Sequence, residues 1–243
     1  MMGKSHLVIS TGITLSVLGL ANQQITLPVI GVTLISSLLP DIDEPNSLLV
    51  RKAFPDWMLR YAKLFLLAVG IFIQFQSTTF APWNTILAIL VGFVLFLPSR
   101  NIRNLFMVLI GMALFQLGEH YAPWSYLIGS LLIICTLVPH RGLTHTLYGV
   151  LTWTALLFYA THSFDRSIWI AGGLSYLLHL LADALTNRGI RPLPPFNFRL
   201  KVRLMTTGTW TGSIVESIFI GATLILVWLV FFQDLNASHY FTF

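Results

Sequence analysis

Charged side chains are scarce in this chain. Only 9% of its 243 residues are charged, while 56% are hydrophobic and the mean hydropathy is +0.78. Soluble proteins carry roughly a quarter charged residues, and 14 basic with 9 acidic side chains cannot cover a 27.3 kDa particle in water. The composition therefore excludes a water-soluble globular protein and predicts a surface covered mostly by lipid.

Cysteine is almost absent as well. The single cysteine, Cys135, lies inside an apolar run. One thiol cannot form an intrachain disulfide, and it cannot build the ligand set of a zinc finger. The sequence therefore excludes both a disulfide framework and a zinc-finger site.

Nine apolar runs have lengths compatible with membrane helices. They lack the period-2 alternation of membrane β-barrel strands, so the chain is expected to be an all-α, polytopic transmembrane helical bundle with about nine spans. The first run is expected to be a retained span, because no cleavage site for a signal peptide follows it. Two runs, 25–39 and 84–97, are shorter than the roughly 20 residues that cross a bilayer squarely, so they borrow polar flanks or re-enter the membrane. The runs are 6–21, 25–39, 58–75, 84–97, 103–118, 124–139, 143–161, 167–184 and 214–232.

Positive charge gathers on one side of this bundle. If all nine runs cross, 13 of the 14 basic residues share one side and only Arg166 lies on the other. The positive-inside rule makes the basic side cytoplasmic. We expect an inner (plasma) membrane protein with its N-terminus in the cytoplasm, its C-terminus outside, and a proline-stiffened cytoplasmic loop over residues 186–213 within a single membrane domain, 1–243.

The net charge of +5 also bears on partners. The basic residues lie between apolar runs instead of clustering on a polar domain, so no nucleic acid is expected as a partner. The lipid bilayer and its anionic headgroups, or an anionic or phosphorylated lipid-like substrate, are the expected negative partners.

Ionisable side chains at membrane depth are energetically costly, so they are functional candidates. Four motifs of this kind stand at the ends of apolar runs, and an even number of spans separates each from the next. That parity places all four motifs on the cytoplasmic side. The candidate metal ligands in these motifs are His6, Asp41, Asp43, His140, His145, His179 and Asp183.

Spacing within two of the motifs suits a shared cation. Asp41 and Asp43 are two residues apart, so their carboxylates point the same way in an extended segment. His179 and Asp183 are four residues apart, which puts both side chains on one helix face. Ordinary structural roles remain open for each pair: Asp-x-Asp after a proline can cap the next helix, and a histidine and an aspartate can hydrogen-bond between helices.

The third motif, residues 140–145, is a short turn with a histidine at each end. Gly142 permits a tight bend that brings His140 and His145 together. Arg141 lies between the two candidate ligands, where it can form a bidentate contact with a substrate phosphate or only determine topology.

The other ionisable residues considered lie on either the cytoplasmic or the outer side of the predicted bundle. Glu216 begins the last span on the cytoplasmic side, where it can be a ligand, a general base or an acid favoured by the helix dipole. His6 also has an ordinary interpretation as an interfacial residue. His120, His162 and His239 fall on the outer side and are excluded from the site.

The ligand types indicate the metal. Imidazole with carboxylate suits zinc, manganese or iron better than calcium or magnesium, and the lack of thiolates argues against a structural zinc. A catalytic zinc usually keeps three protein ligands and one open position, so this inventory has room for two divalent ions. Thr144 and Ser10 are candidate hydrogen-bond donors to the ligands.

The order of the motifs resembles the YdjM-like family of predicted membrane-bound metal-dependent hydrolases. His6 is followed by Pro40-Asp41-Ile42-Asp43, then by His140-Arg141-Gly142-Leu143-Thr144-His145, and last by His179-x-x-x-Asp183-Ala184-Leu185-Thr186. The resemblance implies metal-dependent hydrolysis. About a hundred residues separate Asp43 from His140, and the insert at 58–139 is expected to add four spans, an even number that preserves topology.

Two classes of function compete. The favoured one is a membrane-bound metal-dependent hydrolase that acts at the cytoplasmic face on an ester or phosphoester of a lipid-like molecule, with Glu216 and Arg141 as the expected catalytic residues. The alternative is a metal-ion or proton-coupled transporter that uses the same His/Asp cluster. Transport sites lie near the bilayer midplane, whereas these residues lie at the ends of spans, which favours the enzyme. A purely structural membrane protein explains neither the parity nor the order of the motifs.

Overall fold

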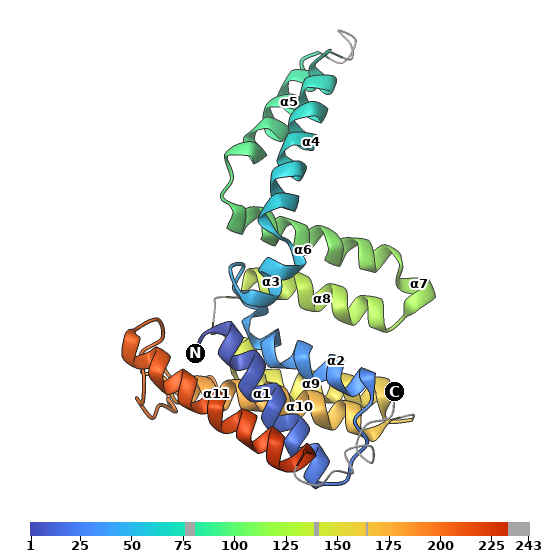
Figure 1. Cartoon of the computed structure of the whole chain (residues 1–243). Helices are drawn as coiled ribbons and strands as arrows, with labels where there is room; N and C mark the ends of the chain where they lie inside the picture. The colour runs from blue at the N-terminus through green and yellow to red at the C-terminus, as the bar shows by residue number, and fades with distance from the viewer. Residues whose placement is uncertain (76–80, 139–140, 164, 233–243) are drawn as a thin grey trace. The chain divides into compact units, whose positions relative to one another are not determined.

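The computed structural model describes residues 1–75, 81–138, 141–163 and 165–232 (Figure 1). These residues form helices joined by turns and loops, and two isolated β-bridges, Thr186 with Met205 and Ile190 with Leu200, are the extended pairings among them. The predicted all-α class is confirmed. The chain divides into two compact units: Met1–Asp43 with Pro139–Phe243, and Glu44–Val138.

The first unit is organised around one helix, α10 (Arg166–Ala184), which packs against α1, α2 and α9, while α11 packs against α1 (Figure 1). Within the apolar stretch of α10, 67% is buried, against 17% for α11. The most buried helix therefore holds the interior of the unit, and α11 presents most of its surface outward. The other elements are α1 (Gly3–Leu20), α2 (Leu27–Leu38), η1 (Leu39–Asp43), η4 (Leu143–His145), α9 (Leu147–Thr161) and α11 (Trp210–Phe231).

Two glycines on α10 explain how α2 and α9 approach it closely. A Cβ atom added at Gly172 would lie 2.1 Å from Leu157 Cδ1 and 2.9 Å from Val32 Cγ1. At the adjacent Gly173 it would lie 2.5 Å from Thr154 Oγ1. Only glycine leaves room here for α2 and α9, as is usual where membrane helices pack closely.

The second unit contains two helix pairs. Helix α4 (Asp56–Phe75) packs against α5 (Trp83–Phe93), and α6 (Ser99–Gln116) packs against α8 (Trp124–Leu137). Short elements complete it: α3 (Leu48–Ala53), η3 (Val94–Phe96) and α7 (Gly118–Tyr121).

This unit begins earlier than the insert expected at 58–139, because the buried Arg103 side chain ties in the preceding segment. Its guanidinium donates to the backbone oxygens of Phe54 and Pro45 at 3.2 and 3.4 Å, to Asn46 Oδ1 at 3.0 Å and to Asp56 Oδ1 at 2.5 Å.

The count of nine spans is not confirmed. Three described helices are long and apolar enough to cross a membrane: α4, α10 and α11. The run at 25–39 forms only the 12-residue α2, which at 1.5 Å per residue is shorter than a hydrocarbon core of about 30 Å. The runs at 84–97, 124–139 and 143–161 likewise form shorter apolar helices.

Candidate metal centre

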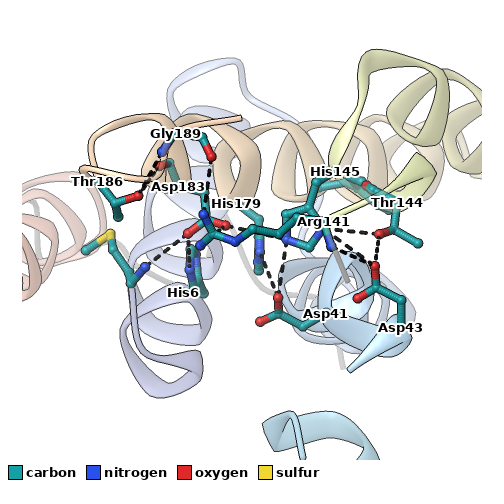
Figure 2. Close-up of polar contacts among 12 residues, drawn as sticks. His6, Asp41, Asp43, Arg141, Thr144, His145, His179, Asp183, Thr186 and Gly189 are labelled. Atoms are coloured by element: carbon teal, nitrogen blue, oxygen red, sulfur yellow. Dashed lines mark hydrogen bonds and ion pairs between the residues drawn. The ribbon is translucent and has the colours of Figure 1, made fainter. Parts of the chain in front are cut away.

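Four separate elements of the first unit bring histidine and aspartate side chains together (Figure 2). The contributing elements are α1, the two 3-10 turns η1 and η4, and the last turns of α10. Two groups have ligand atoms within 4.8 Å of one another: His6 with His179 and Asp183, and Asp41 with His145 and His179. The structure therefore collects five of the residues expected as metal ligands, and His179 belongs to both groups.

The geometry of His179 is that of a metal ligand. Its Nδ1 lies 2.7 Å from the backbone oxygen of Ser37, which can only accept, so Nδ1 carries the proton and Nε2 carries the lone pair. Nε2 is buried, has no hydrogen-bond partner among the described residues and lies 3.7 Å from Asp41 Oδ1. A lone pair facing a carboxylate is unfavourable unless a cation lies between them. The residues present therefore fit a bound metal ion.

Asp183 receives positive charge from several directions. The side chain is buried, and its Oδ1 lies 3.0 Å from the α-amino nitrogen of Met1 and 3.2 Å from His6 Nε2. Its Oδ2 lies 2.9 Å from an Arg141 guanidinium nitrogen and 3.4 Å from His145 Nε2. A buried carboxylate is stable in its ionised form when it is compensated in this way, so Asp183 is an anion that could bind a metal only by giving up one of these partners.

The imidazole rings pack tightly around this carboxylate. His6 stacks on His179 with ring centroids 3.7 Å apart and 15° between the planes. His145 meets His179 edge-on at 5.5 Å. Imidazole binds metal in its neutral form, so a metal ion bound here would release protons from this cluster.

Groups in the two 3-10 turns have shifted pKa values. Burial by itself would raise the pKa of Asp41, but its hydrogen bond with His145 and the neighbouring imidazoles hold that pKa well below the usual range. Burial would lower the pKa of His145, but its hydrogen bonds to Asp183 and Asp41 outweigh burial and raise the pKa to about 9. In the metal-free form a carboxylate on η1 is therefore paired with an imidazolium on η4.

Asp43 lies outside both groups and orients other residues. Its Oδ2 accepts from Thr144 Oγ1 at 2.6 Å and from the backbone nitrogen of Arg141 at 3.1 Å, and it lies 4.0 Å from His145 Nδ1. Thr144 Oγ1 is also 3.1 Å from that same Nδ1. Asp43 and Thr144 thus hold His145 so that its Nε2 faces Asp41 and Asp183, the arrangement usual behind metal-bound imidazoles.

Arg141 has a strained backbone, with φ of +63°. Gly142, at which the sequence predicts the bend, has φ of −80° and ψ of −127°; the approach of His140 to His145 stays a prediction, because His140 lies outside the described residues. The left-handed conformation is held because three groups of Arg141 are occupied: its backbone nitrogen by Asp43, and its guanidinium by Asp183 and, at 3.2 Å, by the Gly189 oxygen. Strain of this kind in a residue other than glycine is typical of functional sites.

Glu216 serves the first helix. This buried carboxylate accepts from the backbone nitrogen of Met2 at 3.1 Å and from the Ser5 hydroxyl, so it joins α11 to the first turn of α1. Neither metal group includes it, and its assignment as a general base stays a prediction.

Neither metal group includes the remaining histidines or the predicted hydrogen-bond donor Ser10. His140 and His239 lie outside the described residues, while His120 and His162 are exposed. Ser10 is buried on α1 without a hydrogen-bond partner among the described residues, and neither metal group includes it.

Sequence reasoning missed the backbone groups of the site. The Ser37 and Gly189 oxygens contact His179 and Arg141, and Tyr176 donates to the Thr144 oxygen at 2.7 Å. Every residue has a backbone carbonyl, so composition carried no signal for the first two. Tyr176 offered a weak one, because it lies three residues before His179 on the same helix.

Comparison with known proteins identifies one matching protein family. Searches of curated proteins and of solved structures found no match. The family model described as YdjM inner membrane protein matches residues 1–239. That match includes every candidate ligand, and it agrees with the apolar helices in making this a membrane protein. The chain therefore belongs to the YdjM inner membrane protein family.

Proposed function

We propose that this protein is a membrane-bound metal-dependent hydrolase that cleaves an ester or phosphoester at the cytoplasmic face. One observation carries the proposal: the buried His179 Nε2 directs its lone pair at Asp41 with no hydrogen-bond donor between them among the described residues. Zinc, manganese and iron suit this mixture of imidazole and carboxylate.

Among the described residues, the two ligand groups share one imidazole and so offer one well-defined ion position. His179, Asp41 and His145 form one ligand group, and His6 with Asp183 extends it on the other side of the shared imidazole. A single imidazole nitrogen binds one ion, and Nδ1 of His179 is already occupied by Ser37. A second ion would therefore need a further ligand. His140 is the candidate, because it is a predicted ligand and lies five residues before His145 in the sequence. When bound, the metal would activate a water and polarise the oxygen of the scissile group.

Arg141 is the residue that we assign to substrate binding. Two of its nitrogens contact Asp183 and Gly189, but Nε has no hydrogen-bond partner among the described residues, and 21% of the side chain is exposed. Nε itself is buried, so a phosphate oxygen at the metal would be held by the exposed part of this side chain. Glu216 is the candidate general base, on the strength of its burial alone.

A second function has its own support. Ser10 and Thr14 follow His6 on one face of α1 and are fully buried, and neither hydroxyl has a hydrogen-bond partner among the described residues. Buried hydroxyls that follow a His/Asp cluster along a helix also support a metal-ion or proton-coupled transporter, because buried polar groups in membrane helices mark ion and proton pathways. Metal-dependent cleavage of a model ester without metal flux into proteoliposomes supports the hydrolase, and flux without cleavage supports the transporter.

Metal content tests the ligand assignment directly. We expect His179→Ala and Asp183→Ala to lower bound metal at least about tenfold in detergent-purified, folded protein, because an ion that loses a ligand is under-coordinated in a low-dielectric setting. His162→Ala is the control, since that imidazole is exposed and, among the described residues, contacts the Phe158 oxygen and ring. Full occupancy in both site variants would refute the assignment.

Turnover tests the role of Arg141. Lysine offers one point of contact where arginine offers a planar fork, so Arg141→Lys should retain metal but lose most hydrolysis of a phosphorylated substrate. Arg199→Lys, on the exposed part of the loop, should be near neutral. Equal turnover in Arg141→Lys and the unmodified protein would favour a carboxylic ester over a phosphoester.

A further inference from the structure

The loop between α10 and α11 combines strong positive charge with exposed apolar side chains. Residues 186–213 contain five basic and no acidic residues. The basic side chains are all exposed. Among the apolar ones, Phe196 is 68%, Phe198 59% and Val202 54% exposed. Exposing these large apolar side chains to water is unfavourable, and no described element of this unit covers them. Such a patch indicates an interaction surface.

This loop is held in place by backbone hydrogen bonds. Ile190 and Leu200 exchange both of their backbone bonds at 3.0 Å, and Val202 and Leu204 donate to the carbonyls of Ala184 and Leu185 at 2.9 Å. Those two carbonyls end α10, directly after the candidate ligand Asp183. The exposed side chains are thus presented by a backbone that is fixed to the site.

The extended part of the loop, residues 197–202, is amphipathic. Side chains alternate across an extended backbone, so Phe198, Leu200 and Val202 share one face while Arg199 and Lys201 share the other. An apolar face beside basic side chains is the pattern of segments that lie in a membrane interface, with apolar groups among the acyl chains and cations on the headgroups. Nucleic acid would leave the apolar face unexplained.

The loop also contacts the turn that carries the candidate site. Leu147 donates to the Pro192 oxygen at 2.9 Å, and Arg141 donates to the Gly189 oxygen at 3.2 Å. We infer that residues 188–204 dock on anionic lipid of the adjacent leaflet and present it to the metal centre, so that the substrate class is an anionic, phosphate-bearing lipid. This inference rests on the proposed hydrolase function, because it names the substrate of that site.

Site-directed fluorescence measures the contact without turnover. The full chain, reconstituted in nanodiscs, carries an environment-sensitive fluorophore at Phe198→Cys or, as matched control, at Asn197→Cys on the opposite face. Cys135 is 2% exposed, so the unmodified chain should label little and supplies the background. We expect spin-labelled phospholipid to quench the label at 198 more than at 197, and aqueous iodide to quench in the reverse order.

Headgroup choice is the second measurement. Spin-labelled phosphatidylglycerol should quench the label at 198 at lower mole fraction than spin-labelled phosphatidylcholine. Arg199→Gln with Lys201→Gln should reduce that preference by about fivefold for each charge removed, whereas Arg199→Lys with Lys201→Arg should retain it.

The outcomes separate this inference from the proposed function. Equal lipid quenching at 197 and 198, or equal quenching by the two lipids, overturns lipid docking even in a protein that binds metal and hydrolyses esters. Docking with anionic preference in a chain that hydrolyses only soluble phosphoesters overturns the substrate class and leaves the hydrolase intact. Docking together with loss of phospholipid turnover in the Gln double variant supports the inference.

Discussion

At the scale of single residues, the orientation of His145 depends on a hydroxyl and a carboxylate behind it. Thr144 Oγ1 lies 2.6 Å from Asp43 and 3.1 Å from His145 Nδ1, so one hydroxyl links the two. A metal-binding imidazole that loses such a partner becomes less basic and less well oriented. The chemistry of the centre therefore extends beyond the residues that would touch an ion.

Thr144→Val tests this support with almost no change in shape. We expect metal affinity to fall about 10- to 100-fold while the protein stays folded, measured by titration of the apoprotein with zinc. Thr161→Val is the matched control, because that buried hydroxyl bonds only to the Leu157 oxygen within α9. An unchanged affinity in Thr144→Val would remove Thr144 and Asp43 from the centre.

At the scale of helices, the close approach of α10 to its neighbours positions His179 and Asp183. The same helix that carries both residues has Gly172 about two turns before His179 and three before Asp183, against Leu157 and Val32. A side chain at that position would push α2 away. Because η1 continues directly from α2, the carboxylate of Asp41 would move as well.

Gly172→Ala should destabilise the protein by about 1–3 kcal/mol, since the added methyl group would lie less than 3 Å from the Leu157 and Val32 side chains, which must shift. The control is Gly31→Ala in α2, where nothing lies within 4 Å of the new Cβ. Alanine there should be neutral or stabilising by up to about 1 kcal/mol. Thermal unfolding of both variants in detergent, with metal content measured alongside, decides between packing and helix propensity.

At the scale of the whole molecule, the candidate metal ligands and the buried Arg103 network belong to different units. Every described candidate ligand belongs to the first unit, Met1–Asp43 with Pro139–Phe243. The second unit is organised by the buried Arg103 and its partners Asp56, Asn46 and Phe54. We therefore expect stability of the second unit and metal binding by the first to be separable.

Arg103→Met provides the test. Loss of a buried guanidinium that satisfies several acceptors should lower stability by about 3–5 kcal/mol, while metal content per folded protein stays constant. Arg100→Met on the same helix is the control, because Arg100 is exposed. Loss of metal from folded Arg103→Met protein would show that the units depend on each other.

Membrane orientation is a further prediction at this scale. We expect alkaline phosphatase, which is active only outside the cytoplasm, to be inactive when fused after Asn187 and active when fused after Ser163, because basic residues follow the first position closely. The reverse pattern would place the candidate centre on the outer face and contradict the orientation derived from charge.

The sequence by itself determined the class of protein and the choice of residues. Low charge and long apolar runs required a helical membrane protein, because lipid cannot satisfy exposed backbone groups in any open sheet. The i, i+4 spacing placed His179 and Asp183 on one face, and the structure brings them together in one group. These inferences depend only on composition and local geometry.

Only the tertiary structure decided which role each candidate residue has at the site. Length in sequence does not show how a run is used: the run at 25–39, which the sequence leaves as a span with polar flanks or a re-entrant segment, forms the 12-residue α2. Asp41 and Asp43 look equivalent in sequence, but the fold turns one toward His179 and the other toward Thr144. The tautomer of His179 depends on the Ser37 carbonyl, 142 positions away. Contacts between distant segments are set by packing, and packing is not visible in local pattern.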